Sequence, residues 1–396
     1  MDKELIKKAL KYHSEGKAGK IEVQPSKHVD TPNDLSLAYS PGVAAPAMEI
    51  DKERWKAYRY TNKGNLIAVI SNGSSVLGLG NIGATAAKPI MEGKAMLFKL
   101  YADIDAFDIE VSDEEPERFI NTVQALSPTF GGINLEDISA PRCFEIETRL
   151  KEELDIPVFH DDQHGTAIVV GAALMNALKL ANKKIEDIKV VLNGAGAAGI
   201  AISKYLMKLG VRDLIAVDRF GIIVEGDTRF NEAQQELAKI TNRNKISGTL
   251  KDAMVGADVF VGVSVANVVT KEMVKTMNEK AILFPLANPV PEISYEDAKE
   301  AGAFIVGTGS SEKPNQINNV LVFPGLFRGA LDVRASTVNQ EMMIAASKGI
   351  MSCVSEEELN TEYILPYAWD ERAHASVAKH VSEAAVATKV NKIKVD

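Results

Sequence analysis

The stretch VLNGAGAAG, from Val191 to Gly199, carries the spacing G-x-G-x-x-G. Such a turn lets a backbone approach the pyrophosphate of a dinucleotide when a buried strand leads in and a helix follows. Residues 189–192 suit that strand, and residues 197–209 show a helical pattern that ends at Gly210. Asp218 follows the next apolar run, nineteen positions after Gly199, where an acid meets the ribose. The predicted coenzyme-binding residues are Gly194, Ala195, Gly196, Ala197, Ala198, Gly199 and Asp218.

The choice between NAD and NADP stays open at this point. An acid such as Asp218 at the ribose favours NAD, whereas the neighbouring Arg219 could accept the 2′-phosphate of NADP.

A second stretch, VLGLGNIGA from Val76 to Ala84, has the same spacing but a different context. Apolar runs at 66–71 and 76–79 flank the turn dipeptide Asn72-Gly73, which predicts an antiparallel hairpin. Pro89 should also interrupt the helix that follows. We therefore interpret Gly78, Gly80 and Gly83 as close-packing glycines near the active cleft, and not as a nucleotide loop.

Short continuous apolar runs alternate with helical patterns after residue 181, which is typical of parallel strands buried on both faces. These runs lie at 189–192, 214–217, 259–263, 281–285 and 304–306. The sequence therefore predicts an α/β fold with a Rossmann-type, doubly wound parallel sheet over 161–385, preceded by a separate domain over 1–160. Residues 21–50 read as a loop with little regular structure, and helices from about 320 to 396 could pack back on the first domain.

Composition excludes several classes of protein. The 396 residues are 46% hydrophobic and 25% charged, with a net charge of −9 and no basic run, which argues against nucleic-acid binding. The N-terminus lacks a secretory apolar segment, and no uninterrupted apolar run approaches the ~18 residues of a membrane span. Two distant cysteines, Cys143 and Cys353, suit a reducing compartment. We expect a cytoplasmic enzyme without membrane or nucleic-acid partners.

Two acidic pairs are candidates for a metal site. Glu136 and Asp137 are adjacent, and so are Asp161 and Asp162 in the segment HDDQHGTA. Such pairs are common on solvated surfaces, but the second pair directly follows the apolar run 157–159, where α/β enzymes place their cleft. Hard carboxylate oxygens favour Mg²⁺ or Mn²⁺ over zinc.

Six motifs, in order along the chain, resemble the malic enzyme family in its short microbial form. They are LAYSPGVAAPA, EGKAMLFK, LEDI, VFHDDQHGTA, FPLANPVPE and NNVLVFPG, and the similarity runs from about residue 10 to 385. The resemblance implies oxidative decarboxylation of L-malate to pyruvate and CO₂ with reduction of NAD or NADP. It also implies a malate- and metal-binding first domain, and a homodimer or higher homo-oligomer.

The resemblance assigns roles to individual residues. Lys94 matches the general base and Tyr39 the general acid, and Glu136, Asp137 and Asp162 match the ligands of Mg²⁺ or Mn²⁺. Asn288, Asn318 and Asn319 match substrate-contacting residues, and Asn288 also suits the nicotinamide. Asp161 is expected only to orient Lys94 or a ligand. Burial and the metal charge should lower the pKa of Lys94, so that it can act as a base.

Two other readings remain. A malolactic-type enzyme shares these motifs but keeps its nucleotide bound and releases lactate. A nucleotide-sensing regulator would have lost catalytic residues, whereas Lys94, Tyr39 and the three metal carboxylates are all present.

Overall fold

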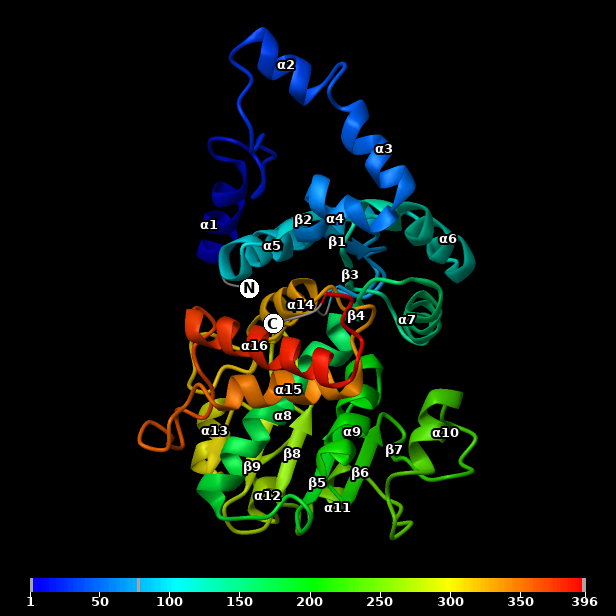
Figure 1. Cartoon of the computed structure of the whole chain (residues 1–396). Coiled ribbons are helices and arrows are strands. Elements are labelled where there is room, and N and C mark those ends of the chain that lie inside the picture. The colour runs from blue at the N-terminus through cyan, green and yellow to red at the C-terminus, as the bar shows by residue number, and fades with distance from the viewer. Residues whose placement is uncertain (1–2, 77–78, 394–396) are drawn as a thin grey trace.

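Parallel strands form two separate sheets that are stacked along the molecule (Figure 1). The computed structural model describes residues 3–76 and 79–393. The first sheet has the order β2-β1-β3-β4, and all its pairings are parallel. Its strands are β1 (Leu66–Ser71), β2 (Asp105–Glu110), β3 (Gly132–Leu135) and β4 (Val158–His160). The crossover helices are α5 (Ala84–Ala102), α6 (Pro116–Leu126) and α7 (Arg142–Glu153).

The second sheet has the order β10-β9-β8-β5-β6-β7. Its strands are β5 (Lys189–Asn193), β6 (Asp213–Asp218), β7 (Gly221–Ile222), β8 (Val259–Gly262), β9 (Ile282–Pro285) and β10 (Ile305–Val306). Only the short β7, among the described strands, pairs antiparallel. The chain leaves β5 first toward β6 and later toward β8, so the strand order reverses at β5. This reversal opens a crevice at the carboxyl ends of β5 and β8, and the doubly wound fold is confirmed.

The first helices of the second half lie on both faces of its sheet, and the last three pack on one another, on α8 and on α5. They are α8 (Asp161–Ala181), α9 (Ala197–Leu209), α10 (Glu232–Ala238), α11 (Leu250–Met254), α12 (Lys271–Lys275), α13 (Tyr295–Glu300), α14 (Phe323–Asp332), α15 (Gln340–Met351) and α16 (Glu371–Ala387). One large core joins α8, α14, α15 and α16 to the facing sides of both sheets. Smaller cores fill the outer faces, one beneath α6 and α7 and the other beneath α11, α12 and α13.

Helix α8 links the two sheets and is both long and apolar. Its length and composition alone would allow it to cross a membrane, but 72% of its apolar window is buried inside the protein. Such burial is what a central core helix shows. The cytoplasmic location stays a prediction.

Helix α14 brings the late part of the chain back to the first sheet. Phe323 of α14 lies 4.7 Å from Phe98 of α5, ring centroid to ring centroid, and Phe327 lies 5.5 Å from it. A side chain added at Gly132 of β3 would meet the Phe327 ring at 3.0 Å. The domain boundary near residue 160 stays a prediction, since this core is built from both parts of the chain.

Three expectations about the first glycine stretch are wrong. Strand β1 is no hairpin arm, because it lies between β2 and β3 and pairs parallel with both. Helix α5 also continues through Pro89, which lies in its second turn. Gly80 and Gly83 have φ of 77° and 80°, and a Cβ at either would meet no described atom within 4 Å. They are turn glycines and not close-packing ones. Gly78 lies outside the described residues.

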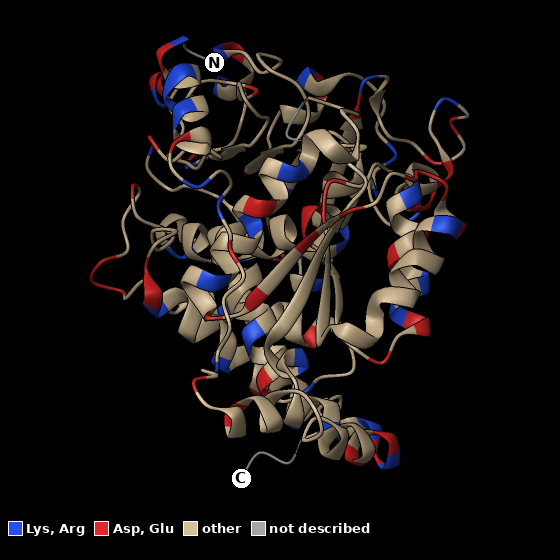
Figure 2. Cartoon of the chain, turned by 90° about the horizontal axis from the view of Figure 1, so that it is seen from above, with Lys and Arg blue, Asp and Glu red and all other residues tan. Residues whose placement is uncertain are grey.

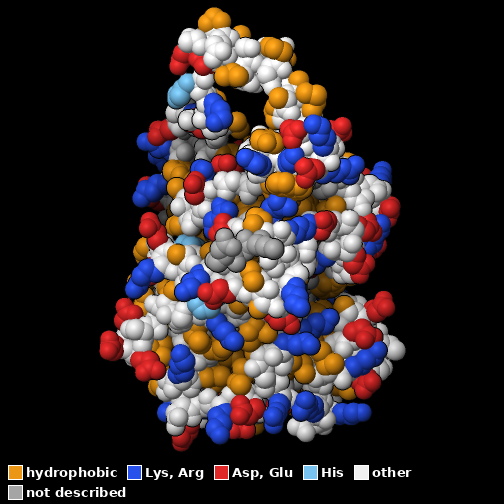
Figure 3. Space-filling view, viewed as in Figure 1, with side chains coloured by type: hydrophobic (Ala, Val, Ile, Leu, Met, Phe, Trp, Pro, Cys, Tyr) orange, Lys and Arg blue, Asp and Glu red, His pale blue; other side chains and the backbone are white. Residues whose placement is uncertain are grey.

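The chain before β1 is more helical than predicted. It contains α1 (Lys3–Ser14), α2 (Pro32–Ala38), α3 (Ala44–Lys52) and α4 (Ala57–Tyr60), with short 3₁₀ turns at Arg54–Lys56 and Asn62–Asn65. Helix α2 is capped by a reciprocal pair, Thr31 and Asp34, which explains why this polar segment is ordered. We call residues 21–52 the N-terminal arm. It stands off from the body as an arch, with apolar side chains on its surface (Figures 1 and 3).

Charged residues of both signs are interspersed along the helices and loops (Figure 2).

Candidate active site

A cavity of about 1050 Å³ opens at the carboxyl ends of β5, β8 and β9. Glycine-loop residues line one side, and acidic residues from the ends of the first sheet's strands line the other. Nine predicted site residues face this one cavity: Asp137, Asp162, Gly196, Ala197, Ala198, Gly199, Asn288, Asn318 and Asn319. The structure therefore brings together most of the residues that the sequence singled out.

The fold requires two of the three glycines in this loop but not the third. A Cβ at Gly194 would lie 2.6 Å from the carbonyl oxygen of Val263, and one at Gly199 would lie 1.8 Å from that of Gly194. Side chains are therefore excluded at both positions by the fold itself. At Gly196, which precedes α9, a Cβ would meet no described atom within 4 Å. A glycine that the fold does not require, at a helix N-terminus facing a cavity, suits the approach of a pyrophosphate.

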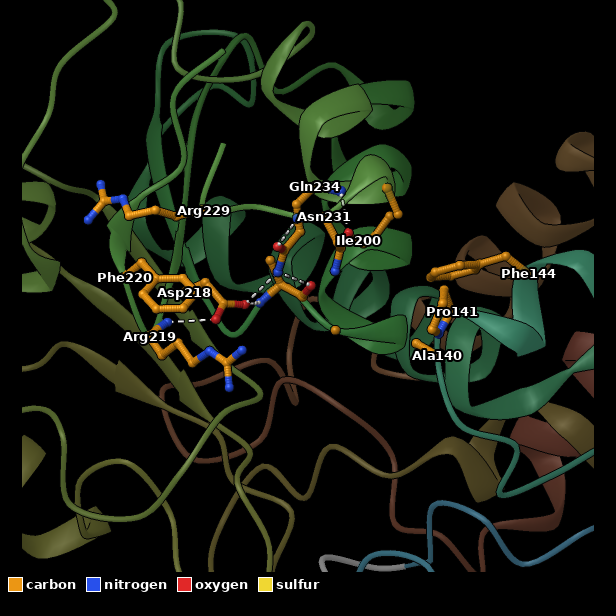
Figure 4. A pocket seen from close by; sticks show the side chains of 13 residues that line it. Ala140, Pro141, Phe144, Ile200, Asp218, Arg219, Phe220, Arg229, Asn231 and Gln234 are labelled. Atoms are coloured by element: carbon orange, nitrogen blue, oxygen red, sulfur yellow. Dashed lines mark hydrogen bonds between the residues drawn. The ribbon is translucent and has the colours of Figure 1, made fainter. Parts of the chain in front are cut away.

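A smaller cavity of about 300 Å³ adjoins the glycine loop beside Asp218 (Figure 4). The Asp218 carboxylate accepts hydrogen bonds from the backbone N–H of Ala195 at 3.1 Å and that of Arg219 at 2.6 Å. Gln234 Nε2 donates to the same carboxylate at 2.9 Å and to the Ala195 carbonyl at 3.1 Å. Arg219 lies over the Phe220 ring, 4.8 Å from its centroid. This cavity suits the ribose and adenine of a dinucleotide.

Lys94 is buried at the junction of the two sheets, with a side chain 7% exposed. Its ammonium contacts the carboxylates of Glu136, at 2.7 Å, and Asp161, and it lies 4.3 Å from the centroid of the Phe323 ring. Glu136 comes directly after β3, and Asp161 opens α8 directly after β4. Because β3 and β4 are parallel neighbours, their carboxyl ends place both acids beside α5.

The electrostatics of this cluster differ from the expectation for Lys94. Burial lowers the pKa of Lys94, but the carboxylates of Asp161, Glu136 and Asp162 raise it by more, so the pKa lies above its usual value. Burial in turn raises the pKa of Glu136 and of Asp161 to about 7 and that of Asp162 to about 6, against the attraction of Lys94. The described cluster thus holds more negative than positive charge in a buried place.

The predicted metal ligands fit a hard cation by chemistry, although they are not arranged around one point. Within residues 3–76 and 79–393, no group of three or more His, Cys, Asp or Glu side chains is arranged to hold a metal ion. Glu136 Oε2 forms an ion pair with Lys94 and accepts a hydrogen bond from Asn134 Nδ2 at 3.0 Å. Asp162 Oδ2 accepts a hydrogen bond from the N–H of Asp137 at 2.7 Å. Buried carboxylates in excess of buried cations are stabilised by an added positive charge. When a metal ion binds, the carboxylate of Glu136 would contact the metal in place of the Lys94 ammonium.

The structure does not bring Tyr39 to Lys94. Tyr39 ends α2 in the N-terminal arm, is 71% exposed, and lies outside both cavities. The arm stands away from the body in Figure 1. A single chain therefore presents Tyr39 to solvent and not to its own cavity.

The three asparagines sit on turns at the rim of the large cavity. Asn288 follows β9, and Asn318 caps the 3₁₀ turn Asn319–Leu321 by accepting the N–H of Val320 at 3.0 Å. Asn319 packs against the start of α8, since a Cβ at Gly165 would lie 3.1 Å from its Cβ. This contact places the asparagine turn next to the Asp161–Asp162 pair.

Sequence reasoning missed Gln234. Gln234 lies in the first turn of α10, where its Oε1 accepts the N–H of Asn231 at 3.1 Å in a capping box. That pattern, Asn-x-x-Gln before a short helix, is visible in the sequence but says nothing of the Asp218 contact. Asp161 lies in the first turn of α8 and contacts Lys94, as the expectation that it orients this lysine required.

Comparison with known proteins agrees with this geometry. The malic enzyme NAD-binding domain model matches residues 163–386, and the malic enzyme N-terminal domain model matches residues 18–116 and 110–151. The chain belongs to the malic enzyme family. A bifunctional malic/malolactic enzyme of Bacillus subtilis is 56% identical over 393 residues, covering 99% of this chain and 96% of that protein.

Other malic enzymes are similarly close. An NAD-dependent malic enzyme of Geobacillus stearothermophilus is 55% identical over 372 residues, covering 94% of this chain and 78% of that protein. The crystal structure of a malic enzyme from Pyrococcus horikoshii has a TM-score of 0.94 at 48% identity and covers 99% of this chain and 93% of that one. The chain is therefore an NAD(P)-dependent enzyme of the malic enzyme family, as its motifs predicted.

Proposed function

We propose that this protein oxidatively decarboxylates L-malate to pyruvate and CO₂ while reducing NAD⁺ to NADH. One observation carries the proposal: a single cavity of about 1050 Å³ joins the glycine loop to Asp137 and Asp162, with the Lys94 cluster directly behind them. A hydride leaving C2 of malate in this cavity would meet a nicotinamide whose pyrophosphate rests on the N-terminus of α9.

Lys94 is proposed to take the proton of the C2 hydroxyl as hydride leaves that carbon. Its partners Asp161 and Glu136 hold the ammonium in one position, and the Phe323 ring excludes water from one side. Asp161 acts on Lys94 as a positioning residue. Loss of CO₂ then leaves enolpyruvate, which needs a proton at C3, and we assign that proton to the Tyr39 hydroxyl.

Glu136, Asp137 and Asp162 would hold the divalent cation. When bound, Mg²⁺ or Mn²⁺ acidifies the C2 hydroxyl and stabilises the negative charge left by CO₂. Neighbouring residues would orient the malate and the nicotinamide. Asn318 and Asn319 face the same cavity and would offer amide groups to the malate carboxylates, and Asn288 lies at the nicotinamide side. This metal requirement follows from the buried excess of carboxylates.

NAD is the coenzyme that the ribose pocket favours. The carboxylate of Asp218 is fixed by Ala195, Arg219 and Gln234, and its remaining lone pairs can accept the ribose hydroxyls. A 2′-phosphate would meet this fixed negative charge, whereas the Arg219 guanidinium lies over Phe220.

A second copy of the chain is proposed to supply Tyr39. The arm carries exposed apolar side chains on both sides of Tyr39, namely Leu35, Leu37, Val43 and Met48. Apolar surface of this kind is stabilised by burial against a partner, and a twofold dimer would exchange two arms at once. The site then consists of Lys94 from one chain and Tyr39 from its partner.

Malolactic chemistry is the second candidate, because the 56%-identical Bacillus subtilis relative is named as bifunctional. The two reactions differ in whether reduced nucleotide is released. We expect malate with NAD⁺ and Mn²⁺ to give rising absorbance at 340 nm and pyruvate in equal amount, with much weaker activity on NADP⁺. Lactate without an absorbance change would instead establish the malolactic reaction. Full activity in excess EDTA would contradict the metal assignment.

A further inference from the structure

The buried carboxylate of Glu292 ties together two turns at the nicotinamide side of the large cavity. Glu292 is 0% exposed and follows the Asn288–Pro291 turn. Its Oε1 accepts the N–H of Ser264 at 2.8 Å and the Ser264 hydroxyl at 3.0 Å. Its Oε2 accepts the N–H of Ala287 at 3.0 Å. One side chain thus holds the turn after β8 and the turn after β9.

Both turns line the cavity, while Glu292 itself lies behind them. Val263 and Ser264 face the cavity after β8, and Ala287 and Asn288 face it after β9. The backbone also joins the same elements, since the N–H of Leu286 donates to the carbonyl of Gly262 at 2.8 Å. The turns therefore form one continuous wall whose spacing depends on the carboxylate between them.

The fold reserves space for this carboxylate. A Cβ at Gly262, the last residue of β8, would lie 2.4 Å from Glu292 Cδ and 2.5 Å from Oε1. In the part of the chain that the structure describes, no Lys, Arg or His forms an ion pair with Glu292. A buried carboxylate without a cation is stabilised only when strong donors satisfy it, and here all of those donors come from the two turns.

The wall is anchored on its other side by the coenzyme loop. Asn193, which directly precedes Gly194, donates from Nδ2 to the Ser264 hydroxyl at 2.7 Å, and the N–H of Val263 donates to the Asn193 carbonyl at 2.9 Å. Gly194 packs against the Val263 carbonyl. The β8 turn therefore keeps contacts with the glycine loop without Glu292, whereas the Ala287–Asn288 turn loses its fixed distance to Ser264.

We infer that Glu292 is a positioning residue that sets the nicotinamide half of the coenzyme site, acting through the Ser264 and Ala287–Asn288 turns. This inference rests on the proposed use of NAD in the large cavity. It assigns Glu292 to the nicotinamide half alone, because the adenosine half is built separately by Asp218, Gln234 and the glycine loop.

The test compares two ligands in Glu292→Gln. The amide keeps one oxygen and turns an NH₂ group toward a backbone donor, so one of the two turns is released. We expect the dissociation constant for NADH, measured by its fluorescence, to rise roughly tenfold or more. The dissociation constant for ADP-ribose, which lacks the nicotinamide, should stay within about twofold. The matched control is Glu300→Gln, a change at an exposed acid on α13 that pairs with Lys271, and it should alter neither value.

Equal weakening of both ligands, or unchanged NADH binding, would overturn the inference. If Glu292→Gln shows no cooperative unfolding transition, Ser264→Ala replaces it, since that change removes the hydroxyl's bonds to Glu292 and Asn193 and keeps the backbone N–H bond to Glu292. Weaker NADH binding with unchanged ADP-ribose binding supports the inference there too, and unchanged NADH binding rejects it. Wild-type protein that binds neither ligand would instead reject the proposed function.

Discussion

At the scale of single residues, the site depends on a lysine whose surroundings keep it charged. The buried ammonium of Lys94 faces Asp161 and Glu136, and these carboxylates raise its pKa against the effect of burial. A lysine in this state keeps its proton and so cannot accept another. The role as a base that we propose for Lys94 therefore requires that Glu136 engage another positive charge, which agrees with the buried excess of carboxylates.

Removal of the Lys94 ammonium should separate chemistry from coenzyme binding. We expect Lys94→Ala to lower malate turnover by roughly 10²–10⁴-fold or more, because proton removal from the hydroxyl loses its acceptor. NADH binding should stay close to that of the wild type, since Lys94 does not line the coenzyme pocket. Lys99→Ala, at an exposed position on the same helix, is the control. Turnover within tenfold of the wild type would contradict the role of Lys94.

The two glycine stretches can be distinguished by a matched pair of alanine substitutions. Gly196→Ala places a methyl group in open space at φ −87°, so the fold should persist while NADH affinity falls at least tenfold. Gly80→Ala also meets open space, but its φ of 77° costs about 1 kcal/mol of stability and should leave NADH affinity unchanged. Fluorescence titration and chemical denaturation measure the two effects. The reverse pattern would assign the coenzyme to the first stretch.

At the scale of elements, continuous apolar runs predicted the strands correctly, whereas a turn dipeptide predicted a hairpin that is not there. The predicted strands at 189–192, 214–217 and 259–263 are strands β5, β6 and β8 to within one or two residues, because burial on both faces leaves a plain signal. Asn72-Gly73 resembled a hairpin turn only locally. The turn instead packs on the start of α5, since a Cβ at Gly73 would lie 2.3 Å from the Gly83 carbonyl, and β1 pairs with the distant β2 and β3.

The candidate site could be predicted as a set of residues but not as an arrangement. The acidic pairs and Lys94 carry their own motifs, so their identity was visible. The pairing of Lys94 with Asp161 joins residues 67 positions apart and follows only from the parallel register of β3 and β4 beside α5. Gln234 and Glu292 make their contacts with turns that lie elsewhere in the sequence. No spacing of residues within a short stretch of sequence indicates such contacts.

The contact between α5 and α14 should carry much of the stability around Lys94. Phe98 is fully buried and packs against Phe323 and Phe327 of α14. We expect Phe98→Ala to lower the free energy of unfolding by about 3–5 kcal/mol, since a large cavity would remain. Urea denaturation gives the value, and Leu100→Ala, at an exposed position on α5, should change it by less than about 0.5 kcal/mol. A loss equal to that of the control would show that α14 does not depend on this ring.

At the scale of the whole molecule, the site of a single chain lacks Tyr39, and the N-terminal arm that carries Tyr39 stands away from it. Tyr39 is exposed on the N-terminal arm, and Lys94 is buried in the body. The start of the arm is tied to the body, because the N–H of Lys20 donates to Glu92 Oε2 at 3.0 Å, but α2 has no buried residue. We therefore propose that a partner chain covers the arm and receives its Tyr39.

Mixing two inactive variants tests whether Tyr39 serves a partner. Tyr39→Phe and Lys94→Ala protein, unfolded together and refolded, should form mixed dimers in which one site has both residues intact. Half of the dimers are mixed and half of their sites are complete, so pyruvate formation should recover to about one quarter of the wild-type rate. Each variant refolded alone is the control. Activity no higher than that of the controls would place Tyr39 in the site of its own chain, or outside the reaction.

The return of α14 to the first sheet has a consequence for synthesis on the ribosome. The layer that holds Lys94 is translated early, yet Phe323 and Phe327, which close its core against Phe98, come from the last fifth of the chain. A nascent polypeptide must therefore keep this apolar face uncovered while some 200 further residues are added, about 10–40 s at ordinary elongation rates. Chaperones that shield emerging chains would find their binding surface here, and catalytic competence would arrive only after release.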